Sequence, residues 1–580
     1  MTFRQEHPKP QFQRENWLNL NGSWGFEIDN ARSGDARGLQ NADAVLSGTI
    51  NVPFCPESKL SGVEHKDFMM GVWYQKKVEL TTQQCAQRVV LHFGAVDYEC
   101  DVFVNGQLVG SHKGGFVSFS FDITNLVAAG ENVITVYARD DVRDSRIPRG
   151  KQCVEYASKG CYYTRTTGIW QTVWLEFTPK TYIKSVRYDT NAQIGVLTVT
   201  AELEGRADLS IEAFYKGKAV GSAKIEKVAG QAVLALQLSE IHLWELGNGR
   251  LYDLHLKFGD DEVSSYFGLR SICMEDGKFI FNGRSVFQRL ILDQGFYPDG
   301  VYTAPTDADL EKDIDMAMDM GFNGGRAHEK IFEERWLYHA DKKGYLVWAE
   351  YPNWGLDHSK PESIYSILPE WLEEIARDRN HPSIIGWCPF NETWDKLLHP
   401  QCDDVIRYIY RITKAVDPSR PCIDTSGFFH VETDIYDIHD YEQDPAEFKR
   451  RYDLLMTENK LYEVFDPPQS YRGRFEFRQS YGGEPVFCSE YGGIRWSMEE
   501  NDESKSWGYG NAVRSEEELK SRFQGLTDAL LDNNKMFGLC YTQLTDIEQE
   551  QNGLYTYDRK PKLDPAWVRS VVARKAAIED

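Results

Sequence analysis

The stretch TDADLEKDIDMAMDMGFNGGRA, residues 306–327, predicts a helix followed directly by a short strand. Its apolar residues recur every three or four positions, as on one buried face of a helix: Leu310, Ile314, Ala317 and Met318. Thr306 and Asp307 are N-cap residue types, and Gly321 stands where a C-terminal cap belongs, just before the strand-like segment 323–327. A helix joined to a strand in this way is the repeating unit of a parallel α/β fold.

The same unit recurs toward the C-terminus. In residues 332–349, Gly344 again separates an apolar helical stripe from a strand. Candidate strands lie at 286–292, 323–327, 345–349, 384–389, 422–424, 434–439, 486–488 and 538–543. Eight parallel strands joined by helices over about 300 residues predict one (β/α)₈ TIM barrel, which we assign to residues 271–580.

The N-terminal half has a different pattern. Residues 1–180 consist of short alternating apolar and polar segments with turns between them, including the hairpin motif Asn105-Gly106. They predict an antiparallel, jelly-roll-like β-sandwich. Residues 181–270 are also rich in strand-like segments, and their length suits an immunoglobulin-like sandwich. The chain is therefore predicted to be multidomain, with two β-sandwiches followed by the barrel.

Composition excludes several classes of partner. The 580 residues carry a formal net charge of -24, and an acidic surface would repel nucleic acid. No apolar run is long enough to cross a membrane, and the first residues lack the pattern of a secretory signal, so we expect a cytoplasmic protein. The 11 cysteines include no C-x-x-C pair, which favours free thiols over a disulfide framework.

Six candidate strands of the barrel end on or near an acidic residue: Asp293, Glu350, Glu392, Asp424, Asp440 and Glu490. Acidic residues are disfavoured inside strands, and the active sites of such barrels lie at the carboxyl ends of the strands. For any single acid, a helix cap or a solvated loop is the alternative. Together they predict a carboxylate-lined pocket. Glycoside hydrolysis needs two such groups, one protonated to help the leaving oxygen depart and one ionised to attack or to activate water.

Two of these acids have a more specific context. Glu392 follows the apolar segment 383–390 in an Asn-Glu pair, and Glu490 follows the segment 484–489 and precedes a Tyr-Gly-Gly turn. They belong to the fourth and seventh candidate strands. This arrangement resembles glycoside hydrolase family 2, within the barrel clan whose acid/base and nucleophile lie on strands four and seven.

The resemblance covers almost the whole chain. Similar short motifs stand in the family's order at 20–24, 52–57, 71–74, 167–173, 279–286 and 553–562. The first domain is thereby expected to be the family's sugar-binding-type sandwich. The resemblance also implies that Glu392 acts as general acid and then as general base, and that Glu490 attacks the anomeric carbon to form a glycosyl-enzyme. A buried, paired glutamate is the alternative for each.

Further site residues follow from the same resemblance. The predicted substrate-binding residues are Asn391, Tyr441, Arg326, Glu350, Asp293 and His439. Asn391 is expected to donate a hydrogen bond to the sugar 2-hydroxyl, Tyr441 to hydrogen-bond the nucleophile, and Arg326 to support it. The alternatives are a helix cap for Asn391 and a structural salt bridge for Arg326.

No metal or other cofactor is expected. His328-Glu329 suggests a zinc helix, but the second histidine of the H-E-x-x-H motif is missing. Lys151, in the segment 148–152, is either within reach of the active site from the first domain or a surface charge, and both interpretations stay open.

Substrate identity depends on positions where the chain departs from its relatives. The β-glucuronidases of the family bind the sugar carboxylate with an Asn-x-Lys element, whereas the corresponding positions here are Glu550-Gln551-Asn552. Glu550 would repel a glucuronate, and the formal match Asn533-Asn534-Lys535 precedes the eighth strand. The sequence therefore favours a retaining exo-glycosidase for neutral sugars, first of all β-galactosides. A β-mannosidase, an arabinosidase and a β-glucuronidase are the alternatives.

A non-catalytic carbohydrate-binding protein is the alternative from another functional class. Two sandwiches and 15 Trp, 30 Tyr and 30 Phe suit sugar binding, but a binding module does not need two paired carboxylates. In either case the expected partner is a carbohydrate. Members of the family often self-associate, so the resemblance also implies a homo-oligomer.

Overall fold

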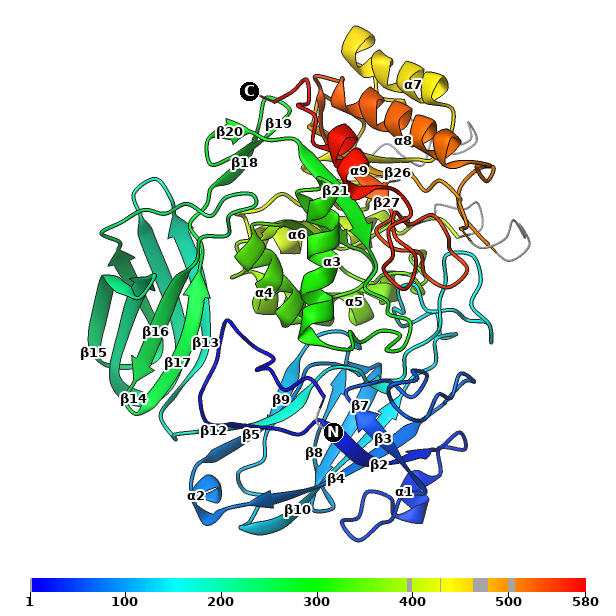
Figure 1. The fold of residues 1–580 in the computed structure, drawn as a ribbon. Helices are drawn as coiled ribbons and strands as arrows, with labels where there is room; N and C mark the ends of the chain where they lie inside the picture. Colours follow the sequence, from blue (N-terminus) through cyan, green and yellow to red (C-terminus); the bar gives the residue numbers. More distant parts are fainter. Residues whose placement is uncertain (1–2, 394–398, 428, 463–477, 499–505, 580) are drawn as a thin grey trace.

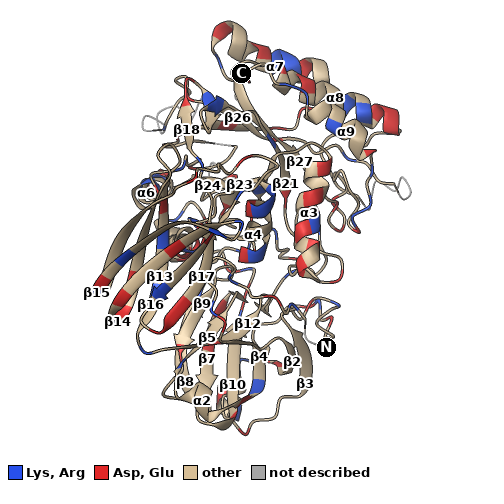
Figure 2. Cartoon of the chain, turned by 60° about the vertical axis from the view of Figure 1, so that its left-hand side comes forward, with Lys and Arg blue, Asp and Glu red and all other residues tan. Residues whose placement is uncertain are grey.

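The computed structural model describes residues 3–393, 399–427, 429–462, 478–498 and 506–579. Figure 1 shows three bodies, two made of antiparallel strands and one made of parallel strands with helices around them. Acidic and basic residues both occur along the helices of the third body (Figure 2). In the part of the chain that the structure describes, no helix has the length and apolar character needed to span a membrane.

The first body consists of two facing antiparallel sheets, ordered β1-β12-β5-β9 and β3-β2-β4-β10-β7-β8. Asn105 and Gly106 form the tight turn between β7 and β8, with φ values of +50° and +80°, as the sequence predicted. The elements are β1 (Trp17–Asn19), β2 (Gly22–Ile28), α1 (Gly34–Arg37), β3 (Gly48–Val52), β4 (Val72–Leu80), α2 (Thr82–Cys85), β5 (Arg88–Phe93), β6 (Val96–Asp97), β7 (Glu99–Val104), β8 (Gln107–Lys113), β9 (Phe119–Asp122), β10 (Gly130–Arg139), β11 (Gly168–Ile169) and β12 (Val173–Thr178).

The second body is built around one long strand. β14 pairs with β13 through its first half and with β16 through its second half, and register shifts near Arg206 separate the two halves. Such bulges bend a strand, so that β14 serves both layers of the sandwich. Side chains alternate between core and solvent along β16, as expected when one face is buried. The strands are β13 (Tyr182–Asn191), β14 (Val196–Tyr215), β15 (Lys218–Gln237), β16 (Tyr252–Phe258) and β17 (Asp261–Phe267).

The third body is the barrel. A small antiparallel sheet precedes it, and its parallel strands follow the order β24-β23-β22-β21-β27-β26-β25. Strands β18 (Ile272–Glu275), β19 (Lys278–Phe281) and β20 (Arg284–Ser285) form the small sheet, and the barrel strands are β21 (Gln288–Asp293), β22 (Gly324–Ala327), β23 (Leu346–Glu350), β24 (Ile384–Cys388), β25 (Tyr436–Asp440), β26 (Val486–Gly492) and β27 (Met536–Thr542). Helices α3 (Asp307–Asp319), α4 (Glu334–Lys343), η1 (Pro361–Ser363), α5 (Ile364–Asp378), α6 (Asp403–Val416), α7 (Pro445–Glu458), α8 (Glu516–Leu531) and α9 (Pro565–Val572) accompany them.

Helix α3 is capped as the sequence predicted. The Thr306 side chain accepts a hydrogen bond from the Asp309 N–H, and the Asp309 carboxylate accepts one from the Thr306 N–H. This reciprocal pair satisfies two backbone donors that the first turn leaves free. After the helix, Gly321 has φ +91° and turns the chain toward β22.

The strand predicted at 422–424 is not a regular strand. The segment makes one isolated parallel bridge to β24, between Trp387 and Cys422, but no continuous ladder. Pro421 has no N–H to contribute, and Asp424 turns its carboxylate onto backbone N–H groups of the loop that follows it. Those local hydrogen bonds compete with strand pairing. The other seven predicted strands are present, with ends that differ by up to four residues.

Arg14 joins the two sandwiches. Its guanidinium binds both carboxylate oxygens of Asp261 in β17, at 2.8 and 2.9 Å, and Glu176 in β12 at 2.7 Å. All three side chains are almost fully buried. Because a buried carboxylate needs a cation to compensate its lost hydration, this contact fixes how the sandwiches pack together.

The Arg14→Met variant should lose about 3–5 kcal/mol of stability, since it leaves two carboxylates buried without their cation. Thermal and urea unfolding of the whole chain measure the loss. The control is Lys77→Met, which removes an exposed pair with Glu131 and should change stability by less than about 1 kcal/mol. Equal unfolding midpoints for the two variants would show that Arg14 has no such role.

Candidate active site

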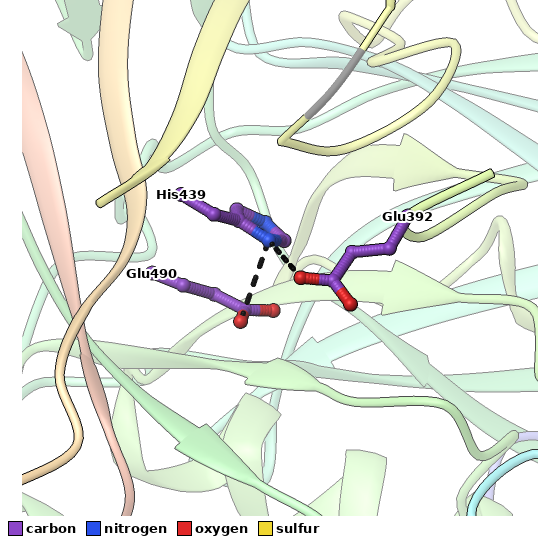
Figure 3. A group of neighbouring side chains, drawn as sticks. All are labelled: Glu392, His439 and Glu490. Carbon is purple, nitrogen blue, oxygen red and sulfur yellow. Dashed lines mark hydrogen bonds and ion pairs between the residues drawn. The ribbon is translucent and has the colours of Figure 1, made fainter. Parts of the chain in front are cut away.

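Two glutamates and one histidine meet at the carboxyl end of the barrel (Figure 3). Nδ1 of His439, in β25, lies 2.8 Å from Oε1 of Glu392 and 3.4 Å from Oε2 of Glu490. Glu392 follows β24, and Glu490 belongs to β26. The nearest oxygen and nitrogen atoms of the three side chains lie within 4.8 Å of one another. The pair predicted from the sequence is therefore brought together, and His439 bridges it.

Strand register decides which of the predicted acids join this pair. In the parallel sheet, Arg326 lies opposite Leu292 and Trp348, and Glu350 lies two residues beyond Trp348 on the same face. Asp293 lies opposite Ala327, one residue beyond Arg326, and therefore faces the other way. Successive side chains of a strand point to opposite faces. The structure thus brings Glu350 and Arg326 to the pair but not Asp293.

Three of the six acids belong to other networks. Asp293 accepts a hydrogen bond from the Gly295 N–H, and the charges near it are those of Asp313, Arg559 and Lys330. The prediction that Asp293 binds substrate is therefore corrected, because its side chain belongs to a separate buried cluster. Asp424 pairs with His430 at 2.7 Å, and Asp440 binds Arg451 of α7 at 2.8 Å.

Arg326 is the centre of the site. Its guanidinium donates to Oε1 of Glu490 at 2.9 Å, to Oδ1 of Asn391 at 3.0 Å and to the Glu350 carboxylate. Arg326 is only 2 % exposed. His328 binds the second oxygen of Glu350 at 2.9 Å, so this glutamate lies between two donors. A rigid guanidinium fork of this kind fixes the relative positions of the groups it binds.

The charge state of Glu490 follows from these neighbours. Burial alone would raise the pKa of its carboxyl. The neighbouring His439, Arg326, His328 and Lys151 outweigh burial and lower the pKa to about 2. Glu490 is therefore ionised at any pH at which the protein is handled.

The residues before Glu392 are held by the loop after β23. The Asn391 N–H donates to Oδ1 of Asn353 at 2.6 Å, and its carbonyl accepts from Asn353 and from the Trp354 indole at 3.0 and 3.1 Å. Nδ2 of Asn391 is buried and has no hydrogen-bond partner among the described residues. Glu392 itself has φ +50°, a left-handed conformation that is uncommon outside glycine and is often found at functional sites.

Tyr441 completes the contacts of Glu490. Its hydroxyl lies 2.5 Å from Oε2 of Glu490 and 3.1 Å from Oγ1 of Thr542. Its ring stacks on Tyr509 with a centroid distance of 3.3 Å. Since a Tyr hydroxyl has a donor proton and an ionised carboxylate has none, the hydroxyl donates to Glu490.

The sequence did not identify several residues of this site, and one of them comes from another body. Lys151 of the first sandwich is 7 % exposed, and its ammonium lies 3.5 Å from the centroid of the Trp354 ring. The sequence had left this lysine undecided between the site and the surface. Trp354, Asn353 and Tyr509 lie in loops without a recognisable motif, so only the fold brings them to the pair.

Glu550 also lies near the pair, but its carboxyl is already engaged. It accepts hydrogen bonds from the Tyr163 hydroxyl and, at 2.9 Å, from the Asn552 amide. Burial raises the pKa of Glu550 to about 7, although Lys151 and these hydrogen bonds act in the opposite direction. The sequence predicted that Glu550 would repel an anionic sugar. Because its carboxyl is hydrogen-bonded and has a pKa of about 7, Glu550 repels such a sugar less than an ionised, exposed glutamate would.

Glu392, His439 and Glu490 also have the spacing of a metal-binding group. However, Nδ1 of His439 is hydrogen-bonded to Glu392, so the histidine already uses the atom that would face an ion between the three. The same geometry is what two carboxylates acting on one sugar carbon require.

Two family models match the chain. The model described as "Glycosyl hydrolases family 2, sugar binding domain" matches residues 18–178, and "Glycosyl hydrolases family 2, TIM barrel domain" matches residues 303–574. Together they cover the first sandwich and most of the barrel.

Named relatives fall into two groups. A β-galactosidase of Thermoanaerobacter pseudethanolicus is 29 % identical over 379 residues, which are 62 % of this chain and 49 % of that protein. The match thus spans about half the length of that relative. A β-glucuronidase of Streptococcus agalactiae is 23 % identical over 596 residues, 94 % of each chain.

Solved structures show the same fold. A β-glucuronidase of an uncultured Clostridium species superposes with a TM-score of 0.78 at 20 % identity and covers 99 % of both chains. A β-glucuronidase of Ruminococcus gnavus, in complex with D-glucuronic acid, gives a TM-score of 0.77 at 20 % identity, over 98 % of this chain and 100 % of that one.

The low pKa of Glu490 predicts a specific pH dependence of stability. Its folded-state value lies below the ordinary 4.5, so ionised Glu490 stabilises the fold above pH 4.5 and this contribution is lost as the pH falls toward 2. Glu490→Gln cannot titrate. The stability advantage of the unmodified protein over this variant should therefore shrink by about 2 kcal/mol between pH 6 and pH 3. Urea unfolding at each pH measures it, and a constant difference would contradict the low pKa.

Proposed function

The chain belongs to glycoside hydrolase family 2, and on this basis we propose that it is a retaining exo-hydrolase of terminal β-glycosides, with Glu490 as the nucleophile and Glu392 as the acid/base. The substrate we propose is a β-glucuronide.

The spacing of the two carboxylates carries the proposal. Their nearest oxygens lie within 4.8 Å of each other. Retaining glycosidases hold the two carboxyl groups about 5–5.5 Å apart, whereas inverting enzymes need a wider gap to admit a water between carboxylate and sugar. A short gap therefore supports direct attack by one carboxylate on the anomeric carbon.

The surroundings of Glu490 suit a nucleophile. The low pKa keeps its carboxylate ionised, and Arg326 and Tyr441 hold its two oxygens. In the first step an oxygen of Glu490 bonds to the anomeric carbon while the bond to the leaving oxygen breaks. The Tyr441 hydroxyl steadies the carboxylate before attack, and its hydrogen bond weakens as the negative charge moves to the leaving group.

Glu392 is the proton carrier of this scheme. It gives its proton to the departing oxygen, then takes one from a water that attacks the anomeric carbon and releases Glu490. Its hydrogen bond with His439 supports this role, because the imidazole orients the carboxyl beside Glu490. The free Nδ2 of Asn391 is available for the sugar 2-hydroxyl, with the amide oriented by Arg326.

The relatives support the glucuronide more than the galactoside that the sequence favoured. The β-glucuronidase of Streptococcus agalactiae matches over 94 % of each chain, whereas the β-galactosidase matches over 49 % of its length. The sequence-based objection rested on Glu550, whose carboxyl is hydrogen-bonded and has a pKa near 7. A β-galactoside is the second candidate, because the β-galactosidase relative has the higher identity.

Substitution of the two glutamates separates their roles. Glu490→Gln should lower turnover of a 4-nitrophenyl glycoside by about 10⁴-fold or more, because no nucleophile remains. Glu392→Ala should still react with this good leaving group, accumulate the glycosyl-enzyme, and recover turnover when azide replaces the activated water. Stopped-flow release of nitrophenol measures both effects.

The control is Asp440→Asn, a strand-end acid that faces Arg451 rather than the pair and should keep turnover within a few-fold. Unchanged turnover in Glu490→Gln would overturn the assignment. Sugar binding without cleavage of any glycoside would favour the non-catalytic alternative.

A panel of 4-nitrophenyl β-glycosides identifies the sugar. Glucuronide should be cleaved with the highest kcat/KM among glucuronide, galactoside, glucoside, mannoside and arabinoside. The product first seen by proton NMR should be the β-anomer, since two displacements restore the starting configuration. A preference for galactoside would select the second candidate, and an initial α-anomer would exclude the retaining mechanism.

A further inference from the structure

The loop that carries Lys151 is fixed against the barrel from both sides. Before it, the Arg149 N–H donates to the Trp354 carbonyl at 2.7 Å. The Lys151 carbonyl itself accepts from the Tyr163 N–H at 2.8 Å. Further along, Gln549 donates to the Gly160 carbonyl at 2.7 Å. This part of the first sandwich is therefore held against the barrel loops that follow β23 and β27.

Lys151 is a buried residue whose ammonium has no hydrogen-bond or ion-pair partner among the described residues. No described carboxylate lies within 4.0 Å of it, and no described group accepts a hydrogen bond from it. It lies over the face of the Trp354 ring, and the Trp354 indole in turn donates to the Asn391 carbonyl. Trp354 thus links the Lys151 ammonium to Asn391, the residue before Glu392.

An unpaired buried ammonium is unfavourable unless something compensates its charge. Here the compensation comes from groups that do not touch it: although burial acts against the charge, the nearby Cys161, Glu392, Glu490 and Glu329 raise the pKa of Lys151. The lysine is therefore charged at neutral pH, yet its donors remain available. Such an ammonium can bind an anionic group of a ligand.

The other cations near the pair are not available in this way. Arg326 is bound to Glu490, Glu350 and Asn391. The formal Asn-x-Lys match lies at the opposite end of the barrel, before β27, where Asn533 donates to the Tyr452 carbonyl and Lys535 to Asn459. Among the residues that the structure describes, Lys151 is the cation beside the catalytic pair that has no partner.

We propose that Lys151 binds the carboxylate of the uronic acid in the substrate, so that the first sandwich selects the sugar on which the barrel acts. This inference rests on the proposed glucuronidase function. The lysine would form a charge-assisted hydrogen bond with a carboxylate at the sugar ring, in a pocket that already contains several acidic groups. Without the cation those groups would repel the substrate, which makes Lys151 a specificity residue and not a catalytic one.

Lys151→Met tests the proposal, because methionine keeps an unbranched apolar chain against Trp354 but has no charge. Two substrates of the same configuration are compared, 4-nitrophenyl β-D-glucuronide and 4-nitrophenyl β-D-glucoside, which differ in a carboxylate against a hydroxymethyl group. The variant should lose about 100-fold in kcat/KM for the glucuronide, mostly through KM. Its kcat/KM for the glucoside should change by less than a few-fold.

The matched control is Lys535→Met, which removes the lysine of the formal motif and should leave the ratio of the two kcat/KM values unchanged. Lys151→Arg should retain most of the glucuronide preference, since the charge is kept. If Lys151→Met fails to fold, as judged from its thermal unfolding midpoint, Lys151→Gln replaces it in the same comparison.

The outcomes separate this inference from the proposed function. If the unmodified protein cleaves glucuronide and Lys151→Met keeps the preference, Lys151 does not select the carboxylate although the function stands. If Lys151→Met loses both substrates equally, the lysine acts on the glutamate pair and the inference is wrong. If the unmodified protein cleaves only neutral glycosides, the proposed substrate fails and this inference fails with it.

Discussion

The buried guanidinium of Arg326 is the constraint on which the site depends. It lies in the barrel interior with almost no solvent contact, and it binds Glu490, Glu350 and the amide of Asn391 at once. A cation buried to this extent is tolerated because carboxylates surround it, and those carboxylates are tolerated because of the cation. The consequence is a Glu490 carboxyl with a pKa near 2 and an Asn391 amide oriented with its donors free.

Chemistry and selection come from different parts of the chain. Glu490, His439 and Arg326 belong to barrel strands, whose hydrogen-bonded ladders hold side chains in fixed positions. Trp354 and Lys151 belong to a barrel loop and to the first sandwich. Loops vary in length and composition more readily than strands do.

The electrostatics of the pocket can be understood as one balance. Glu392, Glu490, Glu350 and Glu550 bring four acidic side chains into a buried site, and Arg326 and Lys151 bring positive charge. Arg326 pairs with carboxylates of the protein, whereas Lys151 has acidic groups near it but none in contact. The carboxylate of an anionic sugar would pair with Lys151, whereas a neutral sugar would leave Lys151 without an ionic partner.

The sequence by itself predicted the architecture and singled out Glu392 and Glu490. Local periodicity and caps such as Thr306 identify helices and strands, and the motifs around Glu392 and Glu490 are contiguous in the chain. The tertiary structure alone decided which acids enter the pocket. A shift of one residue reverses the face of a strand, which is why Asp293 points away while Glu350 points in. It also decided that Lys151 faces the pair, because contacts between residues 200 or more positions apart leave no local pattern in the sequence.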